Sequence, residues 1–138
     1  MGQILLLDDD ANVCRLVPAM LAGLHTVTVA SDWTEVTQQV FRKDFDLVLL
    51  DVNLPVVSGD KIAAVLQKIS VKPLKIVLFS AMDEGELRRL ARSVGAAGYL
   101  VKTLEKQTLR ANIARLLADG RMSSPGAPAP ADRSADRL

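Results

Sequence analysis

The stretch LVLLDVNLP at residues 47–55 decides the fold of this chain. Its four leading apolar residues run directly into Asp51, and Pro55 closes the stretch. An apolar run this short, followed by turn residues, is typical of a strand buried on both faces, which occurs in parallel sheets covered by helices above and below. Ligands bind beyond the carboxyl ends of such strands, so Asp51 is a candidate functional residue.

The composition predicts one folded domain in the cytoplasm. The chain has 138 residues, which suffice for a single core, and we expect that core within residues 1–120. The net charge of +1 does not indicate a nucleic-acid partner, and no apolar run is long enough to span a membrane. Cys14 is the single cysteine and no charged leader precedes the first strand, which favours a cytoplasmic location. Residues 121–138 are rich in proline and alanine, so we expect a disordered tail or linker.

Strand and helix patterns alternate along the chain. Apolar strand patterns lie at residues 3–7, 25–30, 47–50, 74–79 and 99–101, and a helical pattern follows each of them. The segment 25–30 alternates threonine with valine, which predicts an edge strand. His25, the only histidine, has no potential metal ligands beside it in sequence, and we assign it no function. Five such units cannot close an eight-stranded barrel, so we expect an open, doubly wound parallel α/β sheet with helices on both faces.

The helical patterns also predict the roles of individual residues. Asp10 is placed to cap the first helix, Pro18 should bend or weaken that helix, and Gly95 is placed to end the fourth. The expected apolar stripes of the first and second helices include Leu24 and Phe41, respectively. We therefore expect both of these side chains to face the core.

Polar side chains follow four of the five expected strands. Asp8 and Asp9 follow the first strand, Asp51 the third, Ser80 the fourth and Lys102 the fifth. The carboxyl ends of parallel strands share one edge of the sheet, so these side chains should meet there. Converging carboxylates repel one another unless a cation joins them, and an all-oxygen site suits Mg²⁺. Beside a metal, an ammonium and a hydroxyl, Asp51 has the surroundings of a nucleophile that accepts a phosphoryl group as an acyl phosphate.

These residues resemble the receiver domains of two-component response regulators, and the resemblance covers residues 3–119. It implies a flavodoxin-like (CheY-like) fold, in which a five-stranded parallel sheet has the strand order 2-1-3-4-5. It also implies a signalling switch rather than an enzyme, since such a domain catalyses only its own phosphorylation and dephosphorylation. A sensor histidine kinase or histidine phosphotransfer protein would donate the phosphoryl group, and the altered surface would bind a downstream protein.

The resemblance assigns a role to each residue of the set. Asp51 would be the phosphoacceptor and Lys102 the lysine that pairs with the phosphoryl group. The expected Mg²⁺ ligands supply oxygens, and they are Asp8 acting through water, Asp9, Asp51 and the backbone carbonyl of Asn53. The expected switch residues are Ser80 and Tyr99. Pro55 and Gly59 match the loop signature of the family. No nucleic-acid or membrane partner is expected for this chain.

The chain departs from the family after Lys102, where Thr103 replaces the usual proline. The family has a cis peptide bond at this position, and without proline a cis bond costs about 2.5 to 4 kcal/mol. We therefore expect a trans peptide between Lys102 and Thr103. The hydroxyl of Thr103 is then placed to cap the last helix.

Two other functions stay open at this point. A phosphotransfer enzyme of the haloacid-dehalogenase type also uses an aspartyl nucleophile, but it needs a second aspartate where this chain has Asn53. A receiver-like interaction module that is never phosphorylated would not need the set Asp8, Asp9, Asp51 and Lys102. A flavin-binding domain is excluded because three aspartates after the first strand would repel the phosphate.

Overall fold

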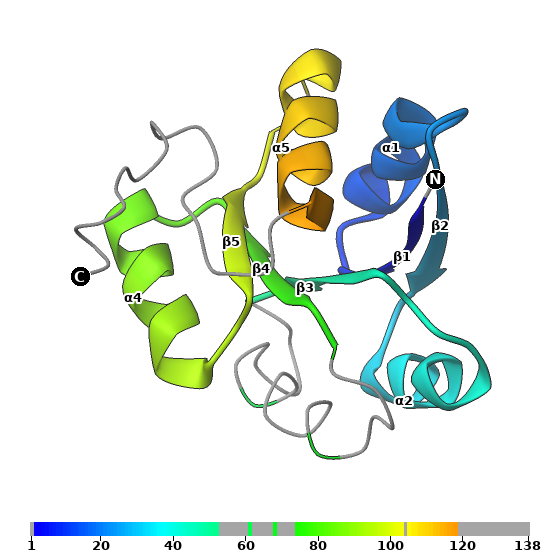
Figure 1. The fold of residues 1–138 in the computed structure, drawn as a ribbon, viewed down its shortest axis with the longest axis horizontal. Helices are drawn as coiled ribbons and strands as arrows, with labels where there is room; N and C mark the ends of the chain where they lie inside the picture. Colours follow the sequence, from blue (N-terminus) through cyan, green and yellow to red (C-terminus); the bar gives the residue numbers. More distant parts are fainter. Residues whose placement is uncertain (1, 53–60, 62–67, 69–73, 104, 119–138) are drawn as a thin grey trace.

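The computed structural model describes residues 2–52, 61, 68, 74–103 and 105–118, and Figure 1 shows their arrangement. The strands are β1 (Gly2–Leu7), β2 (His25–Ala30), β3 (Leu47–Asp51), β4 (Ile76–Ser80) and β5 (Gly98–Val101). The helices are α1 (Ala11–Leu21), α2 (Trp33–Arg42), α4 (Glu84–Val94) and α5 (Lys106–Ala118). The helix expected between β3 and β4, the loop signature at Pro55 and Gly59, and the predicted tail lie outside the described residues.

The strands form one parallel sheet in the order β2-β1-β3-β4-β5, which confirms the predicted topology. Strand β2 lies at an edge, as the alternation of threonine and valine predicted. All five residues of β3 are buried, which explains why this strand reads as a continuous apolar run instead of an alternating one. In the described part of the chain, no helix combines the length and the apolar character needed to cross a membrane.

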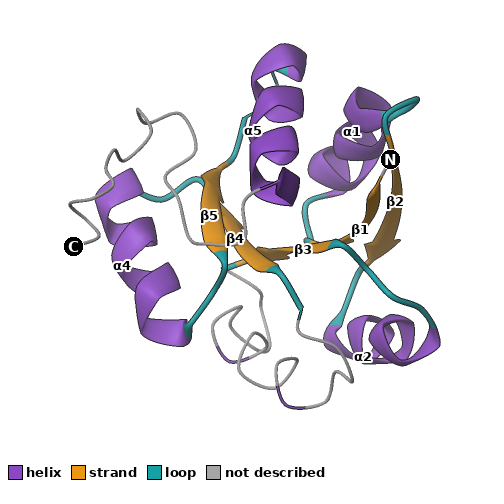
Figure 2. Cartoon of the chain, in the orientation of Figure 1, coloured by secondary structure: helices purple, strands orange, loops and turns teal. Residues whose placement is uncertain are grey.

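Helices cover both faces of the sheet, α1 and α5 on one face and α2 and α4 on the other (Figure 2). Successive residues of a strand point to opposite faces, and β1 shows this clearly. Ile4 and Leu6 join the core cluster beneath α1 and α5, whereas Leu5 and Leu7 join the cluster beneath α2 and α4. The central strands β1, β3 and β4 are therefore largely buried on both faces, whereas the edge strand β2 is partly exposed.

Predicted caps mark the start of α1 and the end of α4. The Asp10 carboxylate accepts hydrogen bonds from the amides of Asn12 and Val13, which confirms the predicted cap of α1. Gly95 ends α4 in the left-handed conformation with φ of 72°, as predicted. Helix α1 continues past Pro18 to its last turn, and the bend expected there stays a prediction.

Two predicted core residues are exposed instead. Leu24 is 42% exposed because α1 ends at Leu21, so Leu24 lies in the turn before β2. Phe41 is 70% exposed on α2. On that helix Val36 is fully buried and Val40 packs against the same cluster, and Phe41, one residue after Val40, points about 100° away from it around the helix axis. The stripe of α2 is therefore narrower than its sequence suggests.

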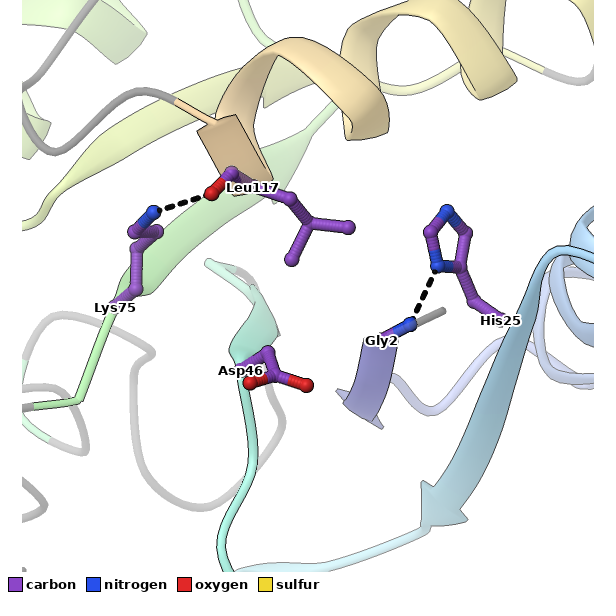
Figure 3. A pocket seen from close by; sticks show the side chains of 5 residues that line it. All are labelled: Gly2, His25, Asp46, Lys75 and Leu117. Atoms are coloured by element: carbon purple, nitrogen blue, oxygen red, sulfur yellow. Dashed lines mark hydrogen bonds between the residues drawn. The ribbon is translucent and has the colours of Figure 1, made fainter.

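Polar contacts tie together the amino-terminal edge of the sheet, which is opposite to the edge carrying the aspartates (Figure 3). The Gly2 amide donates a hydrogen bond of 3.0 Å to His25 Nδ1, and Lys75 Nζ donates to the carbonyls of Leu116 and Leu117 at the end of α5. A pocket opens between these groups, and Asp46 completes its lining. Its polar groups hold strand starts and a helix end in place, so we assign this pocket a structural role.

We predict that neutral His25 stabilises the fold. Burial, reinforced by the charge of the chain's amino terminus, lowers the pKa of His25 despite the opposing charge of Asp46. The folded-state pKa therefore lies below that of the unfolded chain, so the stabilisation is complete above about pH 6.5 and is lost as the pH falls from there to the folded pKa. When the pH is lowered from about 7.5 to about 5.5, the free energy of unfolding should fall less for His25→Asn than for the wild type. The reason is that the amide oxygen of the asparagine side chain can accept from Gly2 and does not titrate. Urea titrations at both pH values measure this difference, and equal losses would contradict the prediction.

Candidate functional site

An ammonium, two carboxylates and a serine lie at the carboxyl ends of four strands, and the ammonium contacts both carboxylates. Asp8 follows β1, Asp51 ends β3, Ser80 ends β4 and Lys102 follows β5. Lys102 Nζ lies 2.9 Å from Asp8 Oδ2 and 3.5 Å from Asp51 Oδ1. Because β4 separates β5 from β3, the lysine stem reaches across the end of β4, and its ammonium lies 5.7 Å from the centre of the Phe79 ring. The contact with this ring favours the charged form of the lysine.

The acidic group consists of Asp8, Asp9 and Asp51, whose carboxylate oxygens lie within 4.8 Å of one another. Asp8 is fully buried and Asp51 is 3% exposed, whereas Asp9 lies at the surface. Asp8 Oδ1 accepts a hydrogen bond from the Asp10 amide. Asp8 Oδ2 is buried without a well-aligned hydrogen bond, although the Lys102 ammonium is close enough to attract it.

The charge of the site is not balanced by its own residues. Three carboxylates and one ammonium leave two formal negative charges within a largely buried group. The donor set is entirely oxygen, and Asp8 offers a buried oxygen without a well-aligned hydrogen bond, so these residues fit a hard divalent cation. Asn53, the fourth predicted ligand, lies outside the described residues. The structure therefore brings together the three side-chain ligands that the sequence predicted.

Burial and the charges of neighbouring residues shift the pKa of Lys102 in opposite directions. Burial, the largest single influence, lowers the pKa of its ammonium, but the attraction of Asp8 and Asp51 outweighs burial, and the pKa is raised above its usual value. Lys102 is therefore a permanent cation at neutral pH. For Cys14, one turn into α1, the two influences act together: burial and the charges of the neighbouring aspartates both raise the pKa of its thiol, which donates to the Asp8 carbonyl.

The two predicted switch residues lie on neighbouring strands and are both buried. Ser80 Oγ accepts a hydrogen bond of 3.1 Å from the Met82 amide, and Ser80 is 1% exposed. Tyr99 is also 1% exposed, and its hydroxyl donates to Glu84 Oε2 at 3.1 Å. The sequence analysis missed Glu84. Its place in the first turn of α4 is readable from the sequence, but its contact with β5 depends on tertiary packing.

The segment after Lys102 follows one prediction and departs from another. The described residues contain no cis peptide bond, so the Lys102–Thr103 bond is trans, as predicted. The prediction that Thr103 caps α5 is wrong. The helix begins at Lys106, and Glu105 caps it by accepting a hydrogen bond of 2.8 Å from the Thr108 amide. Thr103 Oγ1 accepts from the Glu105 amide instead, which forms a turn just before the helix.

We predict that the Lys102 ammonium stabilises the buried carboxylates. In metal-free buffer, Lys102→Met should lower the free energy of unfolding by about 1 to 3 kcal/mol, because the buried Asp8 carboxylate loses its nearest positive charge. Urea titration measures the loss. Adding Asp8→Asn should recover part of it, since an amide carries no charge. Lys106→Met removes an exposed lysine and serves as the control; a loss as large in this control would contradict the prediction.

Comparisons with known proteins identify the family of this chain. The family model described as the response regulator receiver domain matches residues 4–114. The transcriptional regulatory protein ZraR of Escherichia coli K12 is 32% identical over 117 residues, which cover 83% of this chain and 26% of ZraR. RstA of the same strain is 34% identical over 114 residues, which cover 82% of this chain and 47% of RstA. The match therefore spans about a quarter of one regulator and about half of the other.

The structure is similar to that of the chemotaxis response regulator CheY4 of Vibrio cholerae. The TM-score is 0.72 at 25% sequence identity, and the match covers 84% of this chain and 98% of the CheY4 chain. The similarity therefore extends over nearly the whole of that receiver structure.

Proposed function

Because this chain belongs to the response regulator receiver domain family, we propose that it is a phosphorylation-controlled signalling switch whose phosphoacceptor is Asp51. One observation carries the proposal: Asp51 ends the central strand with an ammonium 3.5 Å from its Oδ1 and two further carboxylates within 4.8 Å. Of the three grouped carboxylates, Asp51 alone is itself the last residue of a strand, whereas Asp8 and Asp9 follow the end of β1. We keep the predicted division into a receiver at residues 1–120 and a linker or tail at 121–138 as part of the proposal.

The proposed reaction is transfer of a phosphoryl group to a carboxylate oxygen. An Asp51 oxygen attacks phosphorus, the bond between phosphorus and the donor atom breaks, and the donor departs with the electron pair. Lys102 would then pair with the phosphoryl oxygens, and the Ser80 hydroxyl would donate a hydrogen bond to one of them. Asp8 is a less suitable acceptor because it is fully buried and lies 2.9 Å from the lysine.

The metal ligands in this proposal are Asp9, Asp51, Asp8 through water, and the Asn53 carbonyl. When bound, Mg²⁺ would offset the negative charge that gathers on the transferring group. The excess of two carboxylate charges supports a divalent ion at this place. The chain's own contribution is to hold the carboxylates close together before the ion arrives, so little reorganisation is needed on binding.

The donor in this proposal is a sensor histidine kinase or a histidine phosphotransfer protein, and the readout is a protein partner. Family membership supports both, since receiver domains link a kinase to a downstream target. Ser80 and Tyr99 would carry the change of shape from the phosphoryl group to the surface. The alternatives, a dehalogenase-type phosphotransfer enzyme and a module that is never phosphorylated, differ in measurable ways from this switch.

We predict that Asp51 is the sole phosphoacceptor. Incubation with acetyl phosphate and Mg²⁺ should add one phosphoryl group to the wild type and none to Asp51→Asn, because an amide oxygen cannot form the acyl phosphate. Intact-protein mass spectrometry measures the adduct. Asp44→Asn, which changes an aspartate before the start of β3, should be phosphorylated like the wild type. An adduct that persists in Asp51→Asn overturns the assignment, and an unmodified wild type favours the interaction module.

We predict that Mg²⁺ stabilises the unphosphorylated domain through Asp9. The melting temperature of the wild type should rise with millimolar Mg²⁺, because an ion that binds only the folded state stabilises it by mass action. Asp9→Asn should lose most of this rise. In metal-free buffer it should melt at or above the wild-type temperature, since it removes one of three repelling carboxylates. Differential scanning fluorimetry measures both effects, and a full Mg²⁺ response in Asp9→Asn would contradict the prediction.

A further inference from the structure

Phe79 lies beside the candidate site, and the proposed function gives it no role. It is fully buried in β4, one residue before Ser80, and belongs to the core cluster beneath α1 and α5. It pairs in register with Asp51 on one side and with Leu100 on the other. Residues paired in this way lie next to each other on the same face of a sheet. Phe79 is therefore the neighbour of the proposed phosphoacceptor on β4.

Lys102 has to pass Phe79 to reach the carboxylates. It follows β5, and β4 lies between β5 and the strand that ends in Asp51. Its amide donates a hydrogen bond of 2.8 Å to the Ser80 carbonyl, which fixes its backbone beside the end of β4. Its Nζ lies over the Phe79 ring, 5.7 Å from the ring centre, and its side chain is only 21% exposed. The ring is therefore part of the surface along which the lysine extends.

The ring and the carboxylates attract the ammonium in different ways. Asp8 and Asp51 attract it by their charge, and a divalent cation among the same carboxylates would weaken this attraction because it offsets the negative charge. The ring attracts a cation through the negative face of its π-system. This second attraction does not use the oxygens that a metal ion or a phosphoryl group would occupy. It therefore persists whether or not the carboxylates bind a metal.

We propose that Phe79 is a positioning residue for the phosphorylation of Asp51, because its ring holds the Lys102 ammonium where it can pair with the phosphoryl oxygens. The inference rests on the proposed function and deepens it by one residue. A lysine side chain is flexible, so without the ring its ammonium would spend part of the time away from Asp51. Only molecules with the ammonium in place would react at the full rate. Phe79 takes no part in bond formation and acts through Lys102.

The first test measures the rate of phosphorylation in the full chain. Acetyl phosphate with Mg²⁺ is the phosphodonor, and mass spectrometry follows the initial rate of adduct formation at a temperature where circular dichroism shows every variant to be folded. Phe79→Leu should react about twofold to fivefold more slowly than the wild type, which is the ratio expected for the loss of one cation–π contact.

Phe45→Leu is the matched control for this rate. Phe45 is also buried and also has a lysine over its ring, with Lys43 Nζ 5.4 Å from the ring centre. It lies before the start of β3, however, whereas Asp51 lies at the end of that strand. The control should react like the wild type. The same slowing in Phe45→Leu would overturn the proposal, because the effect would then follow from the loss of any core ring.

A second variant separates the electrostatic effect of the ring from its packing. A fluorinated phenylalanine in place of Phe79 keeps nearly the same shape but withdraws negative charge from the face of the ring. It should therefore slow the reaction about as much as Phe79→Leu does. A wild-type rate in this variant would show that the ring only fills the core, and would overturn the proposal.

A double-mutant cycle in metal-free buffer tests the contact without phosphorylation. Phe79→Leu should lower the free energy of unfolding less in Lys102→Met than in the wild type, since the ring then has no ammonium to hold. Urea titration measures both losses, and equal losses would overturn the positioning role alone. A wild type without any phosphoryl adduct would instead overturn the proposed function and, with it, the role of Phe79 in the reaction.

Discussion

The attraction between one lysine and two buried carboxylates constrains how the strands end at the edge of the sheet that carries the candidate site. Asp8 directly follows β1 and Asp51 ends the neighbouring strand β3, and both residues are buried. Their mutual repulsion is tolerable only with a cation between them, and Lys102 supplies it from beyond β4. Strand β5 must therefore end at the same level as β1 and β3. The pairing register of the sheet meets this requirement, because it allows Lys102 to contact both Asp8 and Asp51.

The parts of the fold that could be predicted from the sequence are those that depend on residues close together along the chain. The run before Asp51 predicted a strand buried on both faces, and each polar residue at a strand end was found at the predicted edge. The cap of α1 by Asp10 was also predictable, because a capping side chain reaches only the next few amides. The same holds for Gly95, whose positive φ suits glycine. These features depend on neighbours in sequence rather than on the tertiary arrangement.

The sequence-based predictions were wrong where the local sequence allows several arrangements and tertiary packing selects one of them. Phe41 fits an apolar pattern, but α2 buries only a narrow stripe around Val36, and periodicity alone does not give the width of the contact. Thr103 and Glu105 are both able to cap a helix, and the chosen start of α5 decides between them. The contact between Glu84 and Tyr99 joins residues fifteen apart, and no short-range pattern encodes it.

The strand that carries Asp51 lies between β1 and β4, with all five of its residues buried. Local opening is rarest in such central strands, so the amides of β3 should be among the slowest in the molecule to exchange with solvent. The proposed phosphoacceptor therefore lies at the end of a central, fully buried strand. We therefore expect β3 itself to change little when Asp51 accepts a phosphoryl group, as proposed.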